Sequence, residues 1–478
     1  MKIDLRDWLA EVEKLGEVKH VDGADWDLEI GTVTALNAKK ARPATLVFDK
    51  IRGYPAGYRV VTGVVNNAHK MCLVLNMEPT GSNNEFVHLL AKKLAAVEKK
   101  VNDFAPVTVK KGPVLENVQK GKEVDMFKFP VPKWHEDDGG RYIGTGHAVI
   151  TRNKTNGRIN LGCYRVAAHN KNTCGLHIAP GKHGRLDFEA YHEEGKPCPV
   201  LISAGHHPLF FALSGCEIPH EALSEYHYAG ALSGTAIDVI NEEVTGLPMP
   251  ANAEIVLAGW CPPGKMMDEG PFGEWTGYYA GGRLPERIIE VERVYYRNNP
   301  IILGGPPDRP PSDFSYSLNT MRSAMILNEL TEHGVPDVKG VWLGDFGGQQ
   351  WMVVSIKQRY AGHAKQTAVL VSQSLLSGAT GRYVIVVDED IDPTNDQEVL
   401  WAMCTRSDPE KDIDIIRRAR SNALDPMVRK PTKAFFNSRA IIDACKPFEW
   451  IEDFPREIKI SAELAESVKK KFGKVLGV

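Results

Sequence analysis

The sequence predicts an α/β protein of two or three domains with a β-rich middle. Its 478 residues exceed the size at which one hydrophobic core stops growing. Near both ends of the chain, helical patterns of apolar residues alternate with short apolar runs, which predicts α/β layering. From about 125 to 305, glycine, proline and short β-branched runs dominate instead, which is typical of a sandwich or barrel.

The first hundred residues contain two predicted helices and two predicted strands. Apolar residues recur at helical spacing over 5–15 and again over 85–100. Between these helices, 44–48 and 58–65 have the composition of strands. We therefore expect an N-terminal α/β part over 1–120.

The proline-rich segment 304–313 ends the β-rich region, and a helical pattern resumes over 321–333. This break predicts a middle domain over 121–310 and a C-terminal domain over 311–478. Strands and helices alternate in the C-terminal domain, which predicts a parallel or mixed sheet. The acids of 386–392 follow a strand end, where metal sites occur, but a solvated loop is the expected arrangement.

Composition and charge exclude several kinds of partner. The chain has 58 basic and 61 acidic residues, so its net charge of -3 attracts neither nucleic acid nor an anionic membrane. No run approaches the ~18 consecutive apolar residues of a membrane span, and the first residues lack a signal-peptide pattern. We therefore expect a cytoplasmic protein. The eight cysteines include no CxxC pair, which argues against zinc sites and disulfide frameworks.

The stretch DEGPFGEWTGYYAGG, residues 268–282, sets three carboxylates in apolar surroundings. The simplest interpretation is a surface loop with solvated acids. However, large apolar neighbours would desolvate a carboxylate that points toward them and raise its pKa toward neutrality. A carboxyl group that exchanges a proton near pH 7 is what general acid catalysis requires. The large neighbours are Pro271, Phe272, Trp275, Tyr278 and Tyr279.

RINLGCYRVAAH, residues 158–169, supplies Asn160 and Arg165 on a predicted strand. The two side chains would lie on opposite faces of a regular strand, although a bulge at Gly162 could realign them. Arg165 alone is typical of a surface residue. Its planar guanidinium could nevertheless hold a substrate carboxylate while it pairs with an acid of the 268–282 loop.

His183 lies in a glycine-flanked turn, and Glu225 lies on a predicted short helix. Each alone is more often structural than a ligand. With Asn160 they form a mixed oxygen and nitrogen set that suits manganese or magnesium better than zinc, particularly if a phosphate supplies further oxygens. The sequence contains no Walker loop, GxSxG elbow or HExxH motif, and GTGHAV lacks the full GxGxxG context.

Five motifs, in this order, resemble the UbiD family of reversible decarboxylases: NLGCYR, GKHG, EALSEYHYAGAL, EGPFGEWTGYYAGG and VIVVDEDIDP. The resemblance covers nearly the whole chain, and NxGxYR and EGPFGExTGYY are its most specific elements. It implies a small N-terminal α/β part, a central split β-barrel of the flavin-reductase-like type, and a C-terminal α/β domain with a linker helix that forms a dimer.

The resemblance also implies prenylated FMN in the middle domain, held at its phosphate by Mn2+ and K+. The residues that match the family motifs are Arg165, Glu269 and Glu274 for a catalytic triad, Asn160, His183 and Glu225 for the divalent metal, and Lys365 as a further cofactor contact. Arg165 also belongs to the implied cofactor-binding set. A flavin prenyltransferase is implied as the supplier of the cofactor.

The implied reaction is the reversible decarboxylation of an aromatic, heteroaromatic or α,β-unsaturated carboxylic acid, with CO2 as the second product. We assign proton donation to Glu274, orientation of the substrate carboxylate to Arg165 and tuning of Arg165 to Glu269. Phe314 and Tyr316 are expected to line the substrate pocket. Two alternatives are a flavin-binding oxidoreductase on a split barrel, which would not need the triad, and a non-catalytic assembly protein.

Overall fold

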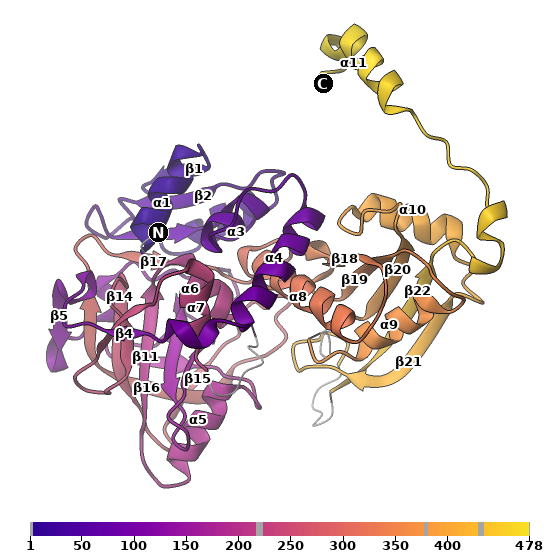
Figure 1. Ribbon diagram of the computed structural model, residues 1–478. Coiled ribbons are helices and arrows are strands. Elements are labelled where there is room, and N and C mark those ends of the chain that lie inside the picture. Colours follow the sequence, from indigo (N-terminus) through magenta and orange to yellow (C-terminus); the bar gives the residue numbers. More distant parts are fainter. Residues whose placement is uncertain (1–2, 217–222, 377–380, 429–434, 478) are drawn as a thin grey trace.

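The computed structural model describes residues 3–216, 223–376, 381–428 and 435–477. Figure 1 shows a larger lobe, which combines the N-terminal and middle parts, and a smaller C-terminal lobe. Helices α4 (Asn83–Glu98) and α8 (Asp313–Glu332) pack together between the lobes. Helix α8 is longer than the helix predicted at 321–333, because it begins at a capping box formed by Ser312 and Ser315.

A four-stranded sheet organises the N-terminal part, in the order β1-β2-β3-β17. The predicted helices and strands of this part are confirmed to within a few residues. The last strand, β17, comes from the end of the predicted middle domain and pairs in parallel with β3. The elements are α1 (Leu5–Lys14), β1 (Val18–Asp22), α2 (Glu29–Ala38), β2 (Thr45–Asp49), β3 (Arg59–Thr62), α3 (Ala68–Val74) and β17 (Ile301–Leu303).

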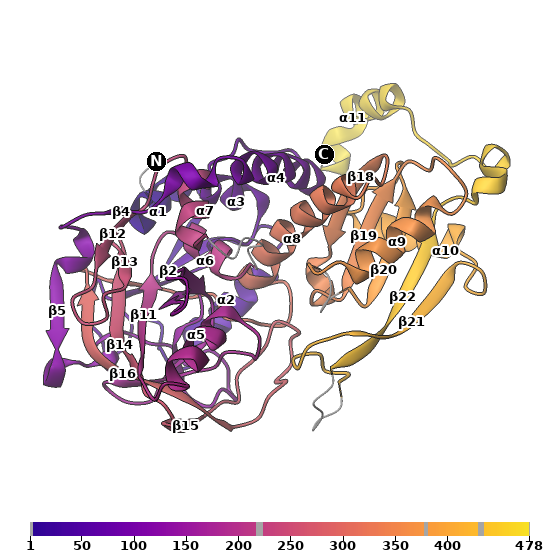
Figure 2. The same cartoon turned by 60° about the horizontal axis from the view of Figure 1, so that its bottom comes forward.

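A ten-stranded antiparallel sheet forms the middle of the larger lobe and curls into a half-barrel (Figures 1 and 2). Its main path is β6-β9-β10-β16-β14-β11-β7-β8, and β5 and β15 both pair with the long strand β16. The strands are β5 (Asn117–Lys120), β6 (Arg141–Gly144), β7 (Ala148–Arg152), β8 (Ile159–Gly162), β9 (Val166–Ala168), β10 (Thr173–Leu176), β11 (Cys198–Gly205), β14 (Ile255–Cys261), β15 (Met266–Glu269) and β16 (Leu284–Tyr296).

Among its described residues, three helices interrupt this β-rich region: α5 (His183–His192), α6 (Pro208–Ser214) and α7 (Glu225–Ser233). Only α7 was expected. All seven residues of α6 are buried, so its sequence is apolar all round and has no amphipathic pattern to detect. A small sheet, in the order β13-β12-β4, completes the lobe with β4 (Val107–Thr108), β12 (Asp238–Asn241) and β13 (Pro248–Pro250).

A mixed five-stranded sheet forms the C-terminal lobe, as the alternating pattern predicted. Its order is β18-β19-β20-β22-β21, with β19, β20 and β22 parallel and an antiparallel strand at each edge. Alternate residues of β20 pack into separate clusters, so helices cover both faces of the sheet. The elements are β18 (Val338–Leu343), β19 (Trp351–Ile356), α9 (His363–Gln373), β20 (Tyr383–Asp388), α10 (Asp396–Arg406), β21 (Ile413–Arg420) and β22 (Phe436–Ala444).

The acids after β20 are held by cations. Arg406 lies 2.8 Å from Asp390 and 3.3 Å from Asp388, and Lys446 lies 2.8 Å from Asp390. Burial opposes ionisation of Asp390, but Arg406 and Lys446 outweigh it and hold its pKa at about 2. These acids are therefore committed to ion pairs.

Helix α11 (Ala462–Leu476) projects away from both lobes at the end of an extended segment (Figure 1). It has its own caps, because Ser461 accepts a hydrogen bond from the backbone of Leu464 and Gly477 adopts a left-handed conformation. Its large apolar side chains Leu464, Val468, Phe472 and Val475 are all exposed.

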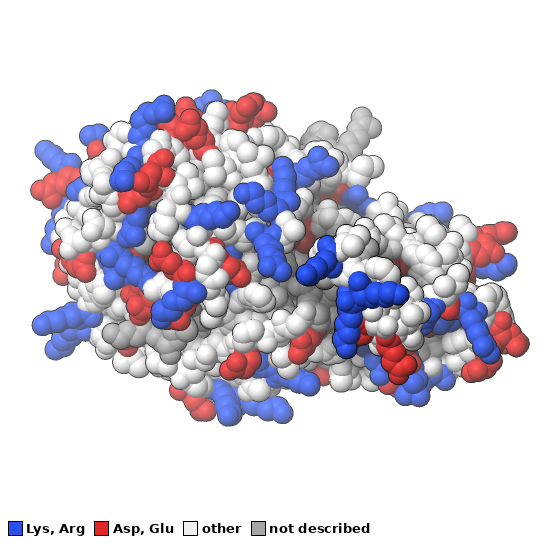
Figure 3. All heavy atoms as spheres, turned by 90° about the horizontal axis from the view of Figure 1, so that it is seen from above, with Lys and Arg blue, Asp and Glu red and all other residues white. Residues whose placement is uncertain are grey.

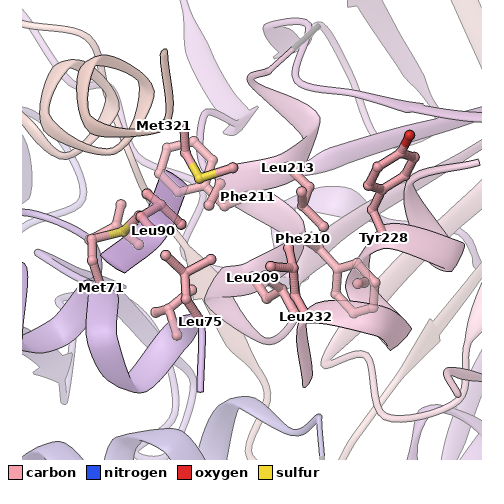
Figure 4. Packing of buried hydrophobic residues seen from close by; sticks show 14 of the residues in the cluster. Met71, Leu75, Leu90, Leu209, Phe210, Phe211, Leu213, Tyr228, Leu232 and Met321 are labelled. Atoms are coloured by element: carbon pink, nitrogen blue, oxygen red, sulfur yellow. The ribbon is translucent and has the colours of Figure 1, made fainter. Parts of the chain in front are cut away.

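One hydrophobic cluster connects all three parts of the chain. Figure 4 shows Met71 and Leu90 from the N-terminal part packed toward Phe211 of α6 and Met321 of α8. Basic and acidic side chains are interspersed on the face shown in Figure 3, in line with the small net charge. In the part of the chain that the structure describes, no helix has the length and apolar composition needed to cross a membrane.

Candidate functional site

The 268–282 stretch is the hairpin loop between β15 and β16. Glu269 is the last residue of β15 and pairs with Leu284, so the loop begins beside the sheet. Two backbone contacts tie the loop to the chain that precedes β6: Gly139 N donates to Pro271 O over 2.8 Å, and Gly273 N donates to Asp138 Oδ1 over 3.3 Å. A Cβ atom on Gly139 would lie 2.0 Å from the carbonyl oxygen of Gly270, so only glycine allows this approach.

Arg165 reaches the loop because the predicted strand 158–169 is interrupted. β8 ends at Gly162 and pairs with β7, whereas β9 begins at Val166 and pairs with β6 and β10. The ring of Tyr164 folds back over Gly162, where an added Cβ would lie 2.1 Å from it. A break, rather than a bulge, thus frees Arg165 from the strand alternation that separated it from Asn160.

Arg165, Glu269 and Glu274 form one buried ion-pair group. Nε and Nη2 of Arg165 contact the two carboxylate oxygens of Glu269 at 3.0 and 2.7 Å. Nη1 donates to Oε1 of Glu274 over 2.6 Å. The side chains of Glu269 and Glu274 are only 1% and 9% exposed, so these contacts are shielded from water. The structure therefore brings the predicted triad together.

Burial distinguishes the acids of this loop. Burial raises the pKa of Glu274, although the charges of Arg165 and His177 oppose the shift. Asp268 is instead solvent-exposed and pairs with Arg283 at 3.6 Å. Of the aromatic neighbours, Phe272 and Trp275 are buried, whereas Tyr278 and Tyr279 are exposed and do not desolvate the acids as expected.

Tyr142 of β6 is a member of the site that the sequence did not reveal. Its hydroxyl donates to Oε1 of Glu269 over 2.7 Å, and its ring packs on Phe272 with 4.3 Å between centroids. The Phe272 ring also lies 5.3 Å from the guanidinium carbon of Arg165. A single tyrosine on a short strand carries no sequence signal for this role.

Asn160 and Glu225 also come together, on the other side of the β8 break. Both are buried, and Oε2 of Glu225 accepts a hydrogen bond from the backbone of Leu161, next to Asn160, over 2.8 Å. Burial raises the pKa of Glu225 to about 7, against backbone hydrogen bonds and the charge of Arg158. This buried carboxylate therefore lacks a fully compensating cation.

Tyr164 connects this pair to His183. Its hydroxyl hydrogen-bonds with Asn160 and accepts the backbone N–H of Gly184 over 3.3 Å. His183 precedes Gly184 as the first residue of α5. Tyr164 thus contacts Asn160 and the backbone next to His183, and Glu225 joins them through the backbone of Leu161. Among the described residues, no group of three His, Cys, Asp or Glu side chains is arranged to hold a metal ion. The predicted set contains only two residues of these types, because its third member, Asn160, is an amide.

Thr151 and Asp187 orient Asn160. The Asn160 amide donates to Oγ1 of Thr151 over 3.3 Å, and Thr151 donates to Oδ2 of Asp187 over 2.6 Å. This chain of hydrogen bonds fixes the amide nitrogen of Asn160 beside Thr151. Asp187 is fully buried and its Oδ1 has no hydrogen-bond partner among the described residues, and burial raises its pKa. A second buried acid near Glu225, whose pKa burial raises despite the charge of Arg158, suits a cation.

Two further predicted residues lie elsewhere. Lys365 is on α9 of the smaller lobe, half exposed and paired with Asp414 of β21. Tyr316 points into the core and donates to Oδ1 of Asn83 over 2.9 Å, so it does not line a pocket. The proline-rich segment 304–313, just before α8, does reach the site, because Arg309 packs against Gly277 of the 268–282 loop.

Three sequence models of one family match consecutive parts of the chain. They describe the N-terminal, Rift-related and C-terminal domains of 3-octaprenyl-4-hydroxybenzoate carboxy-lyase and match residues 9–90, 106–310 and 315–444. Pyrrole-2-carboxylic acid decarboxylase of Pseudomonas aeruginosa is 30% identical over 93% of this chain and 91% of its own. Phenolic acid decarboxylase of Sedimentibacter hydroxybenzoicus is 30% identical over 96% and 94%.

Solved structures support the same family assignment. Vanillic acid decarboxylase of Sedimentibacter hydroxybenzoicus in its open form superimposes with a TM-score of 0.85 at 29% identity over all of both chains. The UbiD-class enzyme HmfF of Pelotomaculum thermopropionicum, in complex with FMN, gives 0.84 at 27% identity over 97% and 98% of the chains. Its evolved dimeric form, in complex with prFMN, gives 0.81 at 26% over the same shares. Matched in all three of its parts, this chain belongs to the UbiD family of carboxy-lyases.

Proposed function

We propose that this protein catalyses the reversible, non-oxidative decarboxylation of an aromatic, heteroaromatic or α,β-unsaturated carboxylic acid with prenylated FMN. The observation that carries the proposal is the buried Arg165 between Glu269 and Glu274, two carboxylates in unlike surroundings. Relatives named as pyrrole-2-carboxylic and phenolic acid decarboxylases support this substrate class. The resemblance to flavin-bound HmfF supports the cofactor and a flavin-reductase-like half-barrel to hold it.

Prenylated FMN, when bound, supplies the electron sink that loss of CO2 from an sp2 carbon requires. The residues of the chain then handle a carboxylate and a proton. In balance, the bond from that carbon to the carboxylate breaks, CO2 leaves, and one proton forms a new C–H bond. Glu274 is the proton donor in this proposal, because burial raises its pKa toward the pH of the reaction.

Arg165 orients the substrate carboxylate. A guanidinium has five N–H donors, and three of them serve Glu269 and Glu274. The remaining two, one on each terminal nitrogen, suit a carboxylate in a two-pronged contact. Burial opposes the charge of Arg165, but the two glutamates outweigh it and raise its pKa, so the residue stays charged.

Asn160, His183 and Glu225 would hold Mn2+, with K+ nearby, to bind the cofactor phosphate. The two buried acids Glu225 and Asp187, which Arg158 compensates only in part, support a cation in this place. Oxygen ligands with one imidazole suit Mn2+, and phosphate oxygens would complete its shell. In this proposal a flavin prenyltransferase supplies the cofactor, and Lys365 contacts the phosphate.

We further propose a homodimer or higher oligomer. The exposed apolar side chains of α11 support it, because an isolated 15-residue helix is marginal in water and gains stability from packing. Sedimentation velocity of full-length protein and of protein ending at residue 454 tests this role. We expect the shorter protein to dissociate, and identical sedimentation states would contradict it.

The central experiment compares apoprotein, FMN-loaded protein and prenylated-FMN-loaded protein on pyrrole, furan, phenolic and cinnamate-type acids. Only the prenylated form should release CO2, and solvent deuterium should enter the product at the carbon that lost it. Full activity with plain FMN, or no activity on any acid with the prenylated cofactor bound, would overturn the proposal.

A further inference from the structure

Tyr142 makes the two triad glutamates unequal. Glu269 receives three donors: the Tyr142 hydroxyl at 2.7 Å and Nε of Arg165 at 3.0 Å on Oε1, and Nη2 at 2.7 Å on Oε2. Glu274 receives one side-chain donor, Nη1 of Arg165, on Oε1. In the part of the chain that the structure describes, no donor contacts Oε2 of Glu274.

We propose that Tyr142 is a positioning residue whose hydroxyl holds the Glu269 carboxylate on Arg165, so that Glu274 is the triad acid that exchanges the proton. The inference rests on the proposed decarboxylase function and adds to it the reason why two similar acids take different roles. Tyr142 acts through Glu269 and is not itself a catalytic residue.

The physical basis is selective hydrogen bonding to a charged form. A donor that binds a carboxylate stabilises the ionised group, and the strength of such a bond is greatest where water is excluded. Tyr142 is 1% exposed. Burial, together with the charge and hydrogen bond of Glu269, raises the pKa of Tyr142, so its hydroxyl keeps its proton and acts only as a donor.

The backbone and ring of Tyr142 are held independently of Glu269. Tyr142 N donates to Pro132 O over 2.8 Å, and its carbonyl oxygen accepts Nε1 of Trp134 over 3.2 Å. The ring packs on Phe272, next to the loop that carries both acids. Removal of the hydroxyl alone therefore changes the donor and leaves the packing in place.

Five charged or titratable groups lie around this pair or beside its neighbours. Arg165 lies between β8 and β9, Asp138 precedes β6, His169 follows β9, Arg283 precedes β16 and Glu274 lies in the acidic loop. They are present in both wild type and variant, so a comparison of the two isolates the hydroxyl.

The test is Tyr142→Phe in the prenylated-FMN holoenzyme, with kcat and KM measured across pH. In this scheme the acid limb reports the loss of the charged triad that Tyr142 supports. Loss of one hydrogen bond to a charged group should move that limb upward by about one pH unit. The matched control is Tyr295→Phe, which removes a 2.8 Å hydrogen bond from a buried tyrosine to Glu242, away from the triad, and should leave the limb in place.

Glu269→Gln supplies the second comparison. If Tyr142 acts through Glu269, Tyr142→Phe should change kcat less than about twofold in the Glu269→Gln background. An unshifted acid limb, or a full additional loss in that background, would overturn the inference.

A thermal readout separates this inference from the proposed function. The fall in Tm caused by Tyr142→Phe should be largest at neutral pH and shrink on acidification, because a neutral carboxyl group depends less on the donor. A fall that is equal at every pH would overturn the inference even if the enzyme is active. A pH-dependent fall without decarboxylation of any acid would sustain it while the proposed function fails.

Discussion

Glu274 meets Arg165 through one hydrogen bond, of 2.6 Å between Oε1 and Nη1. Glu274→Gln keeps the shape of this contact but cannot deliver a proton. We expect turnover to fall on the order of 10² to 10⁴ fold with cofactor occupancy unchanged. Hydrogen-deuterium exchange into the product, followed by NMR, should slow in parallel. If Glu269→Gln abolishes exchange while Glu274→Gln does not, the two roles are reversed.

Arg165→Lys should raise KM as well as lower kcat. An ammonium cannot hold two carboxylates and offer a planar pair of donors to a third. Steady-state kinetics with the best substrate of the panel measures both constants. Wild-type KM in this variant would mean that the substrate carboxylate lies elsewhere.

Thr151→Val should weaken Mn2+ binding, because the Asn160 amide loses the partner that fixes its orientation. Outer contacts of this kind contribute about 10- to 100-fold in metal affinity. Titration of FMN-loaded protein with Mn2+, followed by electron paramagnetic resonance, gives the Kd. Thr245→Val is the matched control, since Thr245 is also a buried threonine that donates to a carboxylate, Glu242, over 2.7 Å. Equal affinities in wild type and Thr151→Val would contradict the assignment.

Glu225 predicts the pH dependence of metal binding. Its pKa of about 7 means that it is protonated in the metal-free protein below neutrality. A metal must then displace that proton, so the Kd for Mn2+ should rise by up to roughly tenfold per pH unit as the pH falls below 7. Isothermal titration in buffers of different ionisation enthalpy measures the proton release. Glu225→Gln should lose both metal and cofactor, and retention of both would exclude Glu225 as a ligand.

Lys365→Ala tests the proposed phosphate contact. If Lys365 binds the phosphate, the variant should lose FMN affinity, which fluorescence titration measures. Lys357→Ala is the control, because Lys357 is also a half-exposed lysine of the smaller lobe, paired with Glu389 at 3.2 Å. Unchanged FMN affinity in Lys365→Ala would restrict Lys365 to its ion pair with Asp414.

The sequence predicted elements that have a clear apolar pattern. Helix α1 has one buried face, and the central strands β19 and β20 of the C-terminal lobe contain continuous apolar runs. Helix α6 was not predicted, because it is buried on every side. Strand β17 was assigned to the middle domain, since its pairing with β3 joins residues about 240 positions apart, and no local pattern encodes such a partner.

Some residues of the candidate site could be predicted from the sequence and others could not. Arg165, Glu269 and Glu274 lie in motifs specific enough to be found from the sequence. Tyr142 and Asp187 act through hydrogen bonds to residues distant in the chain, Glu269 and Thr151, and lie outside the quoted motifs. The interruption after Gly162, which releases Arg165 from the strand that carries Asn160, depends on how Tyr164 packs and was not predictable from strand alternation.

The long strand β16 also has a consequence for folding. Arg165 and Glu269 are 104 residues apart in the chain, and Tyr142 and Glu269 are 127 apart. Arg165 and Tyr142 can meet Glu269 only after β10 and β15 have both paired with β16. Contacts of such high sequence separation carry a large loop-closure cost and form late. During refolding, helix signals should therefore recover before the charged cluster assembles, and a chain with native-like secondary structure can still be catalytically inert.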